Sequence, residues 1–365
     1  MQLIVLFVYS WYFLYILLSV GCVSYGQTAR KYSNEFLNIG VDAAALGMGN
    51  SVIAQTNDVN SAYWNPSGLV NLESKQISLM HASYFANIAQ YDYAAFAMPI
   101  DDKSAVALSM IRFGVDDILN TTELIDQNGN IDYNRISLFS TADYAFTASY
   151  ARKLNVEGLS VGANAKVVRR IIGKFANSWG FGFDVGMQYK TASDWQFGAI
   201  VREITTTYNT WSINKKEFDK IKDAVPGQNQ DLPETTEITL PKLQLGAAKN
   251  FGLTEDLSLM AAMVLHTEFA QTNAVVSTKG FSLQPSAGVE FGYAKMVFVR
   301  GGVGNFQNEL QIDGNEKVTF QPNLGLGFRY KGIQIDYALT NIGEQSAALY
   351  SNIFSLKLDL SIFSK

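Results

Sequence analysis

A histidine and a serine two positions apart are the residues best placed to do chemistry in this chain. Alternate side chains of a β-strand point to the same side, so His81 and Ser83 would share one face with Ile77 and Leu79. An imidazole can activate a nearby hydroxyl as a nucleophile when a third polar group orients the ring, and Asn87 is the nearest candidate for that role. We find no donor for an oxyanion hole. A polar patch near the end of a strand is therefore the interpretation that we favour.

Other catalytic and cofactor signatures are weak. Two histidines are too few for a histidine-rich metal centre, and the single cysteine, Cys22, lies in the leading apolar segment. Gly47 and Gly49 lack the third glycine that a dinucleotide-binding fingerprint needs, because the position is Val52. The net charge of -5 gives no basic footprint for nucleic acid. We expect no metal, no cofactor and no nucleic-acid partner.

The chain begins with a segment that is typical of export. Residues 3–23 are almost wholly apolar, and the small residues Ser24 and Gly26 that follow suit signal peptidase. We predict that residues 1–26 are a cleaved signal peptide and that the mature chain starts at Gln27. A retained anchor and lipidation of the cysteine inside the run are the alternatives, because no Lys or Arg precedes the run.

The composition favours an alternating β protein. Hydrophobic residues make up 48% of the chain and charged residues only 17%, yet the mean hydropathy is +0.03. Apolar residues are therefore diluted by polar ones throughout. After residue 26 no run reaches the 18 or more apolar residues of a membrane helix, so a chain that crosses a bilayer must do so as a closed barrel.

Alternation of apolar with polar or glycine residues recurs along most of the chain. From Trp179 to Lys190, for example, every second residue is large and apolar. This pattern predicts an all-β fold, a transmembrane barrel of fourteen antiparallel strands, an even number as in bacterial barrels. We expect strands near 75–85, 89–100, 104–114, 141–153, 157–170, 175–190, 193–203, 241–250, 256–267, 282–293, 295–304, 318–331, 332–341 and 351–363.

The connections between these strands fall into two classes. Those after even-numbered strands are short, and those after odd-numbered strands include all the long ones. Short turns mark the periplasmic side of such barrels, so we expect both chain termini to be periplasmic. A soluble β-sandwich also alternates, but it would not predict this asymmetry. The long connections run about 115–140, 204–240, 268–281, 305–317 and 342–350.

Residues 27–74 do not alternate, and the barrel is expected to occupy residues 75–365. Small residues in the earlier segment permit close approach of the backbone, and Asp58 could cap a short helical turn that Pro66 and Gly68 then end. A compact segment of this kind is expected to sit in the lumen as a plug. The candidate plug residues are Gly47, Met48, Gly49, Asn57, Asp58, Tyr63, Asn65, Pro66 and Gly68.

Three stretches carry a resemblance to a known family. They are residues 31–37 (KYSNEFL), 45–49 (ALGMG) and 63–69 (YWNPSGL). At these residues the chain resembles the PorV/PorQ family of the type IX secretion system, within the FadL-like outer-membrane barrels. The resemblance implies a fourteen-stranded, plugged barrel that serves protein secretion in Bacteroidota. It leaves open whether the chain is PorV-like or PorQ-like, and it supplies no catalytic residues.

The resemblance also implies partners. PorV-type members bind the C-terminal sorting domain of secreted cargo and associate with the translocon pore and the attachment machinery. Outer-membrane lipid would surround the barrel. The alternative is a FadL-like channel for hydrophobic small molecules. A distant alternative is an outer-membrane lipid hydrolase that uses His81 and Ser83.

One loop is a candidate for contact with a partner. Residues 214–217 resemble the start of a helix, and Pro226 would end it. Phe218, Ile221 and Val225 then recur on one side. An exposed apolar stripe on a loop suits a partner contact, whereas a helix folded over the rim of its own barrel is the alternative.

Overall fold

The computed structural model describes residues 33–365 except for residues 86, 126–128, 225–234, 312–313, 341–350 and 364–365. The chain divides into two compact units, Met1–Arg30 and Lys31–Lys365. The predicted signal peptide lies outside the described residues, as does the start of the predicted plug. Within the second unit, short helical turns precede an antiparallel sheet.

In the described part of the chain the sheet contains 17 strands. It closes on itself, because β17 (Ser351–Asp359) pairs with β1 (Gln76–Tyr84). Fourteen strands follow one another around the ring, as the alternation predicted. The other strands of the ring are β2 (Ala89–Pro99), β3 (Ser104–Asn120), β4 (Ser137–Lys153), β5 (Leu159–Ile172), β6 (Ala176–Lys190), β7 (Trp195–Arg202), β10 (Lys242–Gly252), β11 (Leu257–Glu268), β13 (Ser282–Tyr293), β14 (Val297–Leu310), β15 (Glu316–Tyr330) and β16 (Ile333–Thr340).

Three short strands, β8 (Thr207–Ile213), β9 (Thr236–Thr239) and β12 (Val276–Ser277), were not predicted. β8 continues the line of β7, because β6 pairs with β7 at one end and with β8 at the other. Between β7 and β8, Glu203 and Thr206 have φ of 54° and 60°, which breaks the strand. Pro241 separates β9 from β10, and a proline has no N–H for the ladder.

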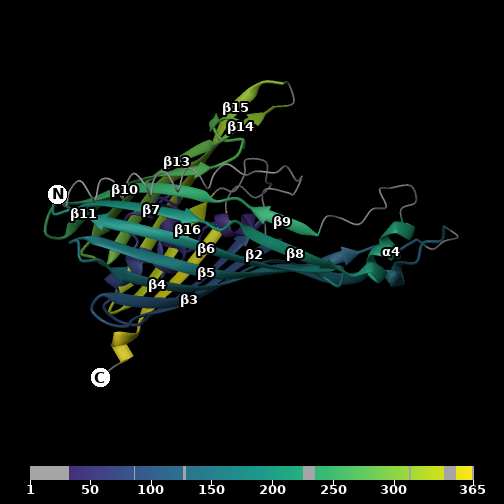
Figure 1. Cartoon of the computed structure of the whole chain (residues 1–365), viewed down its shortest axis with the longest axis horizontal. Helices are drawn as coiled ribbons and strands as arrows, with labels where there is room; N and C mark the ends of the chain where they lie inside the picture. The colour runs from purple at the N-terminus through teal and green to yellow at the C-terminus, as the bar shows by residue number, and fades with distance from the viewer. Residues whose placement is uncertain are drawn as a thin grey trace, which may run out of the picture. The chain divides into compact units, whose positions relative to one another are not determined.

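The two ends of the barrel differ, as Figure 1 shows. The short-turn end holds the connections 100–103, 154–158, 191–194, 253–256, 294–296 and 331–332. The long-loop end holds the other connections. The last described residues form a 3-10 turn, η5 (Leu360–Phe363), which follows β17 at the short-turn end. The predicted last strand, 351–363, is therefore four residues too long.

Strands reach into two of the predicted long loops. β3 extends to Asn120, and β4 begins at Ser137. In the same way, β14 extends to Leu310, and β15 begins at Glu316. These extensions contain polar residues on both faces, so they carry no apolar alternation that a sequence pattern could detect. The connections predicted at 115–140 and 305–317 are present, but for this reason both are shorter than predicted. The predicted loop at 342–350 lies outside the described residues.

The outward side chains of the ring are apolar and exposed. Phe181, Phe183, Val185 and Met187 on β6 are all 45–59% exposed, whereas the residues between them are buried. This is the reverse of a soluble barrel and matches a wall that faces lipid. Aromatic side chains mark the borders of this band. Tyr150, Tyr189, Trp195, Tyr293 and Tyr330 lie near the short-turn end, and Trp179 and Tyr208 lie toward the long-loop end.

The segment before β1 lies inside the ring. It folds as η2 (Glu35–Asn38), α2 (Ala43–Gly47), α3 (Ser61–Trp64) and η3 (Pro66–Asn71), and most of its residues are buried. These turns pack on the inner faces of strands from both ends of the chain, including β5, β15 and β16. Among the described residues, no helix is long and apolar enough to span a membrane. We call residues 33–75 the plug.

Candidate functional site

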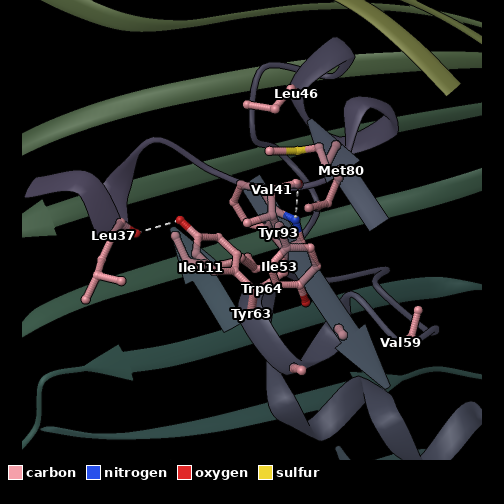
Figure 2. Packing of buried hydrophobic residues seen from close by; sticks show 14 of the residues in the cluster. Leu37, Val41, Leu46, Ile53, Val59, Tyr63, Trp64, Met80, Tyr93 and Ile111 are labelled. Carbon is pink, nitrogen blue, oxygen red and sulfur yellow. Dashed lines mark hydrogen bonds between the residues drawn. The ribbon is translucent and has the colours of Figure 1, made fainter. Parts of the chain in front are cut away.

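The plug has a small core of its own around two aromatic residues. The Tyr63 hydroxyl donates to the carbonyl of Leu37 at 2.6 Å, and the Trp64 indole N–H donates to the carbonyl of Val41 at 3.0 Å. The two rings meet edge to face, with centroids 4.9 Å apart. Figure 2 shows the Tyr63 hydroxyl directed at Leu37, with Trp64 close to Tyr63. These bonds hold the first turn of the plug against the later helix α3.

Asn65 ties the plug to the wall. Its amide nitrogen donates to the carbonyls of Ile53 at 3.0 Å and of Met187 on β6 at 3.1 Å. Its side-chain oxygen accepts from the Ser67 hydroxyl at 2.7 Å and from the Ser67 backbone N–H. Asn65 therefore caps η3, while Pro66 occupies the first position of that turn, where a missing N–H costs nothing. The Asn-Pro-Ser stretch of the predicted plug motif is thus a structural anchor.

Gly68 allows the turn η3 to pack on the loop before α3. A Cβ at this position would overlap the carbonyl oxygen of Thr56 and lie 2.7 Å from the Ser61 hydroxyl. Asn57, another residue of the predicted motif, is exposed in that same loop. The structure therefore gives Gly68 a packing role and assigns no contact to Asn57.

A partly buried ion pair joins the plug to the seam of the barrel. The Asp58 carboxylate accepts from the Lys357 ammonium on β17, and their side chains are 22% and 11% exposed. The second Asp58 oxygen accepts from the backbone N–H of Asn60 at 2.8 Å. The sequence predicted the capping role of Asp58 but not its partner, which is 299 residues away. Nearby, the backbone N–H of Ala43 donates to the Ser355 hydroxyl at 2.6 Å.

The Gly47-Met48-Gly49 stretch lies directly against the wall. A Cβ on Gly47 would lie 2.9 Å from the Cα of Gly325, and one on Gly49 would lie 2.8 Å from the backbone nitrogen of Val303. Gly49 also has φ of 63°. The predicted close approach of the backbone is confirmed here. The wall side of the contact was not predicted: Met48 sits over Gly288 and Gly302, where any Cβ would collide with it.

Charged side chains of the wall hold the other side of the plug. The Arg202 guanidinium donates to the carbonyl of Tyr63 at 2.9 Å and lies 4.7 Å from the centre of its ring. Beside it, Lys166 pairs with Asp184 at 2.8 Å and with Glu203, and all three are buried. Buried charges are tolerated when they are paired and hydrogen-bonded in this way.

On the long-loop side of the plug lies a cavity of about 570 Å³. Plug residues from Glu35 to Trp64 form its floor, and inward residues of the wall form its sides. Lys242 pairs with Glu268 at 2.8 Å and with Glu35 at 3.5 Å, and Arg202 also lines the cavity, so two cationic and two acidic side chains offset one another. Side-chain amides are the main lining group, namely Asn38, Asn50, Gln244, Gln271, Asn273, Gln284, Asn305, Gln307 and Gln321.

Plug and cavity are built from the same strands. On each of five strands of the ring, an inward glycine lies at plug level. A polar residue of the same strand, a few residues toward the long-loop end, lies at cavity level. On β13, for example, Gly288 faces Met48 while Gln284 lines the cavity. The pairs are Gly198 and Arg202 on β7, Gly246 and Gln244 on β10, Gly288 and Gln284 on β13, Gly302 and Asn305 on β14, and Gly325 and Gln321 on β15.

The candidate catalytic pair does not form a catalytic arrangement. His81 and Ser83 share the outward face of β1, as predicted, but the Ser83 hydroxyl donates to Asn87 at 2.9 Å. The His81 ring instead meets Asp92 at 2.7 Å. The prediction that Asn87 orients the imidazole was wrong, because the turn after β1 folds Asn87 back onto the serine.

The predicted loop helix is present as α4 (Lys215–Ala224), and it ends just before Pro226. It is fixed to the connection between β5 and β6: Asn214 donates to the carbonyl of Lys174 at 3.2 Å, and Glu217 pairs with Lys174 at 2.8 Å. Phe218 is half-buried. Ile221 falls within the helix, although its side chain is outside the described part, and Val225 lies beyond the described residues. The helix therefore rests on the rim of its own barrel.

Comparison with known proteins adds two findings. Residues 26–267 match the family model described as "Type IX secretion system protein PorV". A search of curated protein sequences finds no match.

Solved structures share the fold at low identity. A Pseudomonas aeruginosa FadL homologue has a TM-score of 0.51 and 13% identity, over 91% of this chain and 100% of its own. The P. putida toluene transporter TodX gives 0.55 and 13%, over 88% and 98%. The Ralstonia pickettii toluene transporter TbuX gives 0.51 and 13%, over 88% and 98%. At this identity the likeness shows a FadL-like barrel and nothing about the substrate.

Proposed function

The chain belongs to the PorV family of type IX secretion system proteins, and we propose that it binds secreted proteins through their C-terminal sorting domains and hands them over at the outer membrane. Family and fold make it an outer-membrane β-barrel and a component of a secretion system, not an enzyme. The partners that this proposal requires are cargo sorting domains and proteins of the translocon or the attachment machinery.

The observation that carries the proposal is the way the plug is held. Asp58, Asn65 and Met48 each bind or pack on a different part of the wall. A protein that passed cargo along its own lumen would have to break these contacts, including the ion pair of Asp58 with Lys357. A barrel closed in this way is better suited to carry a partner than to conduct one.

The cavity supports binding of a polypeptide. Side-chain amides both donate and accept hydrogen bonds, so they complement the N–H and C=O groups of a peptide backbone. Two cationic side chains, Arg202 and Lys242, offset the two carboxylates of Glu35 and Glu268, so the cavity selects neither a cation nor an anion. We infer that a polar segment of the cargo enters the cavity from the long-loop end.

This proposal needs the long-loop end to face the cell exterior. Bacterial barrels place short turns in the periplasm and long loops outside, so the short-turn end and the carboxy terminus are assigned to the periplasm. Helix α4 would then lie at the cell surface. Its Phe218, Ile221 and Val225 remain candidates for contact with a partner, because α4 reinforces a rim that cargo would approach.

An export assay tests the proposal. Deleting the gene should retain proteins with a C-terminal sorting domain in the periplasm, and the wild-type gene should restore their release. Pull-down from detergent-solubilised outer membranes should recover sorting-domain or translocon proteins. Normal export in the deletion strain would contradict the proposal.

A channel for hydrophobic solutes is the second candidate, and the fold that the chain shares with toluene transporters favours it. The mixed lining of the cavity, in which side-chain amides are prominent, argues against it, because a site for hydrocarbons is mostly apolar. The same deletion strain separates the two functions. Slower uptake of a hydrophobic nutrient with normal export would support the channel.

A further inference from the structure

A groove of about 520 Å³ lies on the outside of the wall, over β1, β2, β3, β16 and β17. Its lining is mainly apolar, and it faces the surroundings of the barrel, not the lumen. His81 and the carboxylate of Asp92 lie on its border. The apolar side chains that line it are Leu79, Ala94, Met110, Ile335, Phe354 and Leu356.

A polar row borders this groove on the side of the long-loop end. Asp92 meets His81 at 2.7 Å and Arg112 at 3.6 Å, and Arg112 also meets Asp116 at 3.0 Å. His81 and Asp92 are 55% and 39% exposed, so both retain a free side. Cross-strand pairing places these residues in one outward row over six strands, which reads Tyr337, Phe354, His81, Asp92, Arg112 and Tyr144.

The row has the position of a membrane interface. Tyrosines gather where a membrane protein crosses the level of the lipid headgroups, and Tyr337 and Tyr144 end the row on either side. The groove continues from the row toward the short-turn end, at the depth of the acyl chains. Other outward charges of the described wall, such as Arg169 and Lys249, lie singly over a tryptophan ring. Placing neighbouring charges of both signs against lipid costs free energy, so such residues indicate a functional site.

We propose that this groove binds one outer-membrane lipid whose headgroup carries both a phosphate and a primary amine. The Arg112 guanidinium and the His81 imidazole suit the phosphate, and the free side of the Asp92 carboxylate suits the ammonium group. The acyl chains lie in the groove against Leu79 and Met110. A purely anionic headgroup would meet the carboxylates of Asp92 and Asp116, so charge complementarity selects the zwitterionic lipid.

The test measures lipids retained by the purified protein in native mass spectrometry. The protein is placed in nanodiscs that contain equal amounts of phosphatidylethanolamine and phosphatidylglycerol. The wild type should retain phosphatidylethanolamine about fivefold more than phosphatidylglycerol, as expected for one additional charge-assisted hydrogen bond. Asp92→Asn should reverse this preference, because the ammonium partner is lost while the phosphate partners remain. Arg112→Gln should release both lipids.

Arg169→Gln is the matched control, since Arg169 also faces outward but packs over Trp179 at 4.6 Å. It should retain lipids as the wild type does. Equal retention of the two lipids by the wild type would overturn the proposal, and so would an unchanged preference in Asp92→Asn. Stronger retention of added lipid A by the wild type would also overturn it, because the ligand would then be anionic.

Discussion

The lumen of this barrel has two levels that are made by the same strands in opposite ways. At plug level the inward residues of the wall include glycines without side chains: Gly288 and Gly302 leave room for the backbone at Met48. At cavity level the wall extends amides such as Gln284 and Asn305 into open space. The comparison shows that one strand can fix a plug with its glycines and present a binding surface with the residues that follow. It also predicts opposite consequences for substitutions only a few residues apart.

The largest effect is expected from the ion pair at plug level. Lys357→Ala leaves the partly buried Asp58 carboxylate without its charge partner, which should cost about 3 kcal/mol of unfolding free energy, the low end of the range for buried pairs. Urea unfolding of the barrel in lipid vesicles measures this loss. The control is Lys190→Ala, whose pair with Asp194 is 61% and 64% exposed and should be nearly neutral. Equal stability of the two variants would mean that the plug is not anchored at the seam.

A smaller loss is expected from the glycine contact. In Gly302→Val the added side chain collides with the backbone of Met48, and overpacking of this kind costs about 1–3 kcal/mol. Limited proteolysis of the folded protein should cut the plug faster. The neighbouring variant Gly301→Val is the control, because nothing lies within 4 Å of a Cβ there. If both variants behaved alike, close packing of the plug would not be what fixes it.

The smallest change in stability is expected at cavity level. Gln284→Ala should alter the unfolding free energy by less than about 0.5 kcal/mol, because its amide faces an open cavity. It should weaken binding of a purified sorting domain about two- to tenfold, the value of one hydrogen bond. Isothermal titration gives the affinity. Destabilisation comparable to that of Gly302→Val would erase the distinction between the two levels.

Much of the barrel could be predicted because a membrane wall repeats one rule. Phe181, Phe183 and Val185 face lipid on one strand, and the same alternation marks the other strands of the ring. The rule stops where the wall leaves the bilayer. That is why the polar ends of β3, β4, β14 and β15 were taken for loops, and why β8 and β9 were not predicted.

The plug residues were recognised as a group, but most of their contacts could not be predicted. The cap at Asn65 follows from local sequence, because its partner Ser67 is two residues away. The pairing of Asp58 with Lys357 depends on how the barrel closes around the plug. Which glycine faces Met48 depends on strand register. Alternation predicts only which face of a strand points inward, not which residues lie opposite each other.

Photo-crosslinking from the cavity tests the central claim most directly. A photoreactive amino acid replaces Gln284 in the cavity or, as a control, Leu324, which is 65% exposed on the outer face. During active export, the account predicts adducts with sorting-domain proteins from position 284 and none from position 324. Normal export without any protein adduct at position 284 would contradict a cavity that receives cargo.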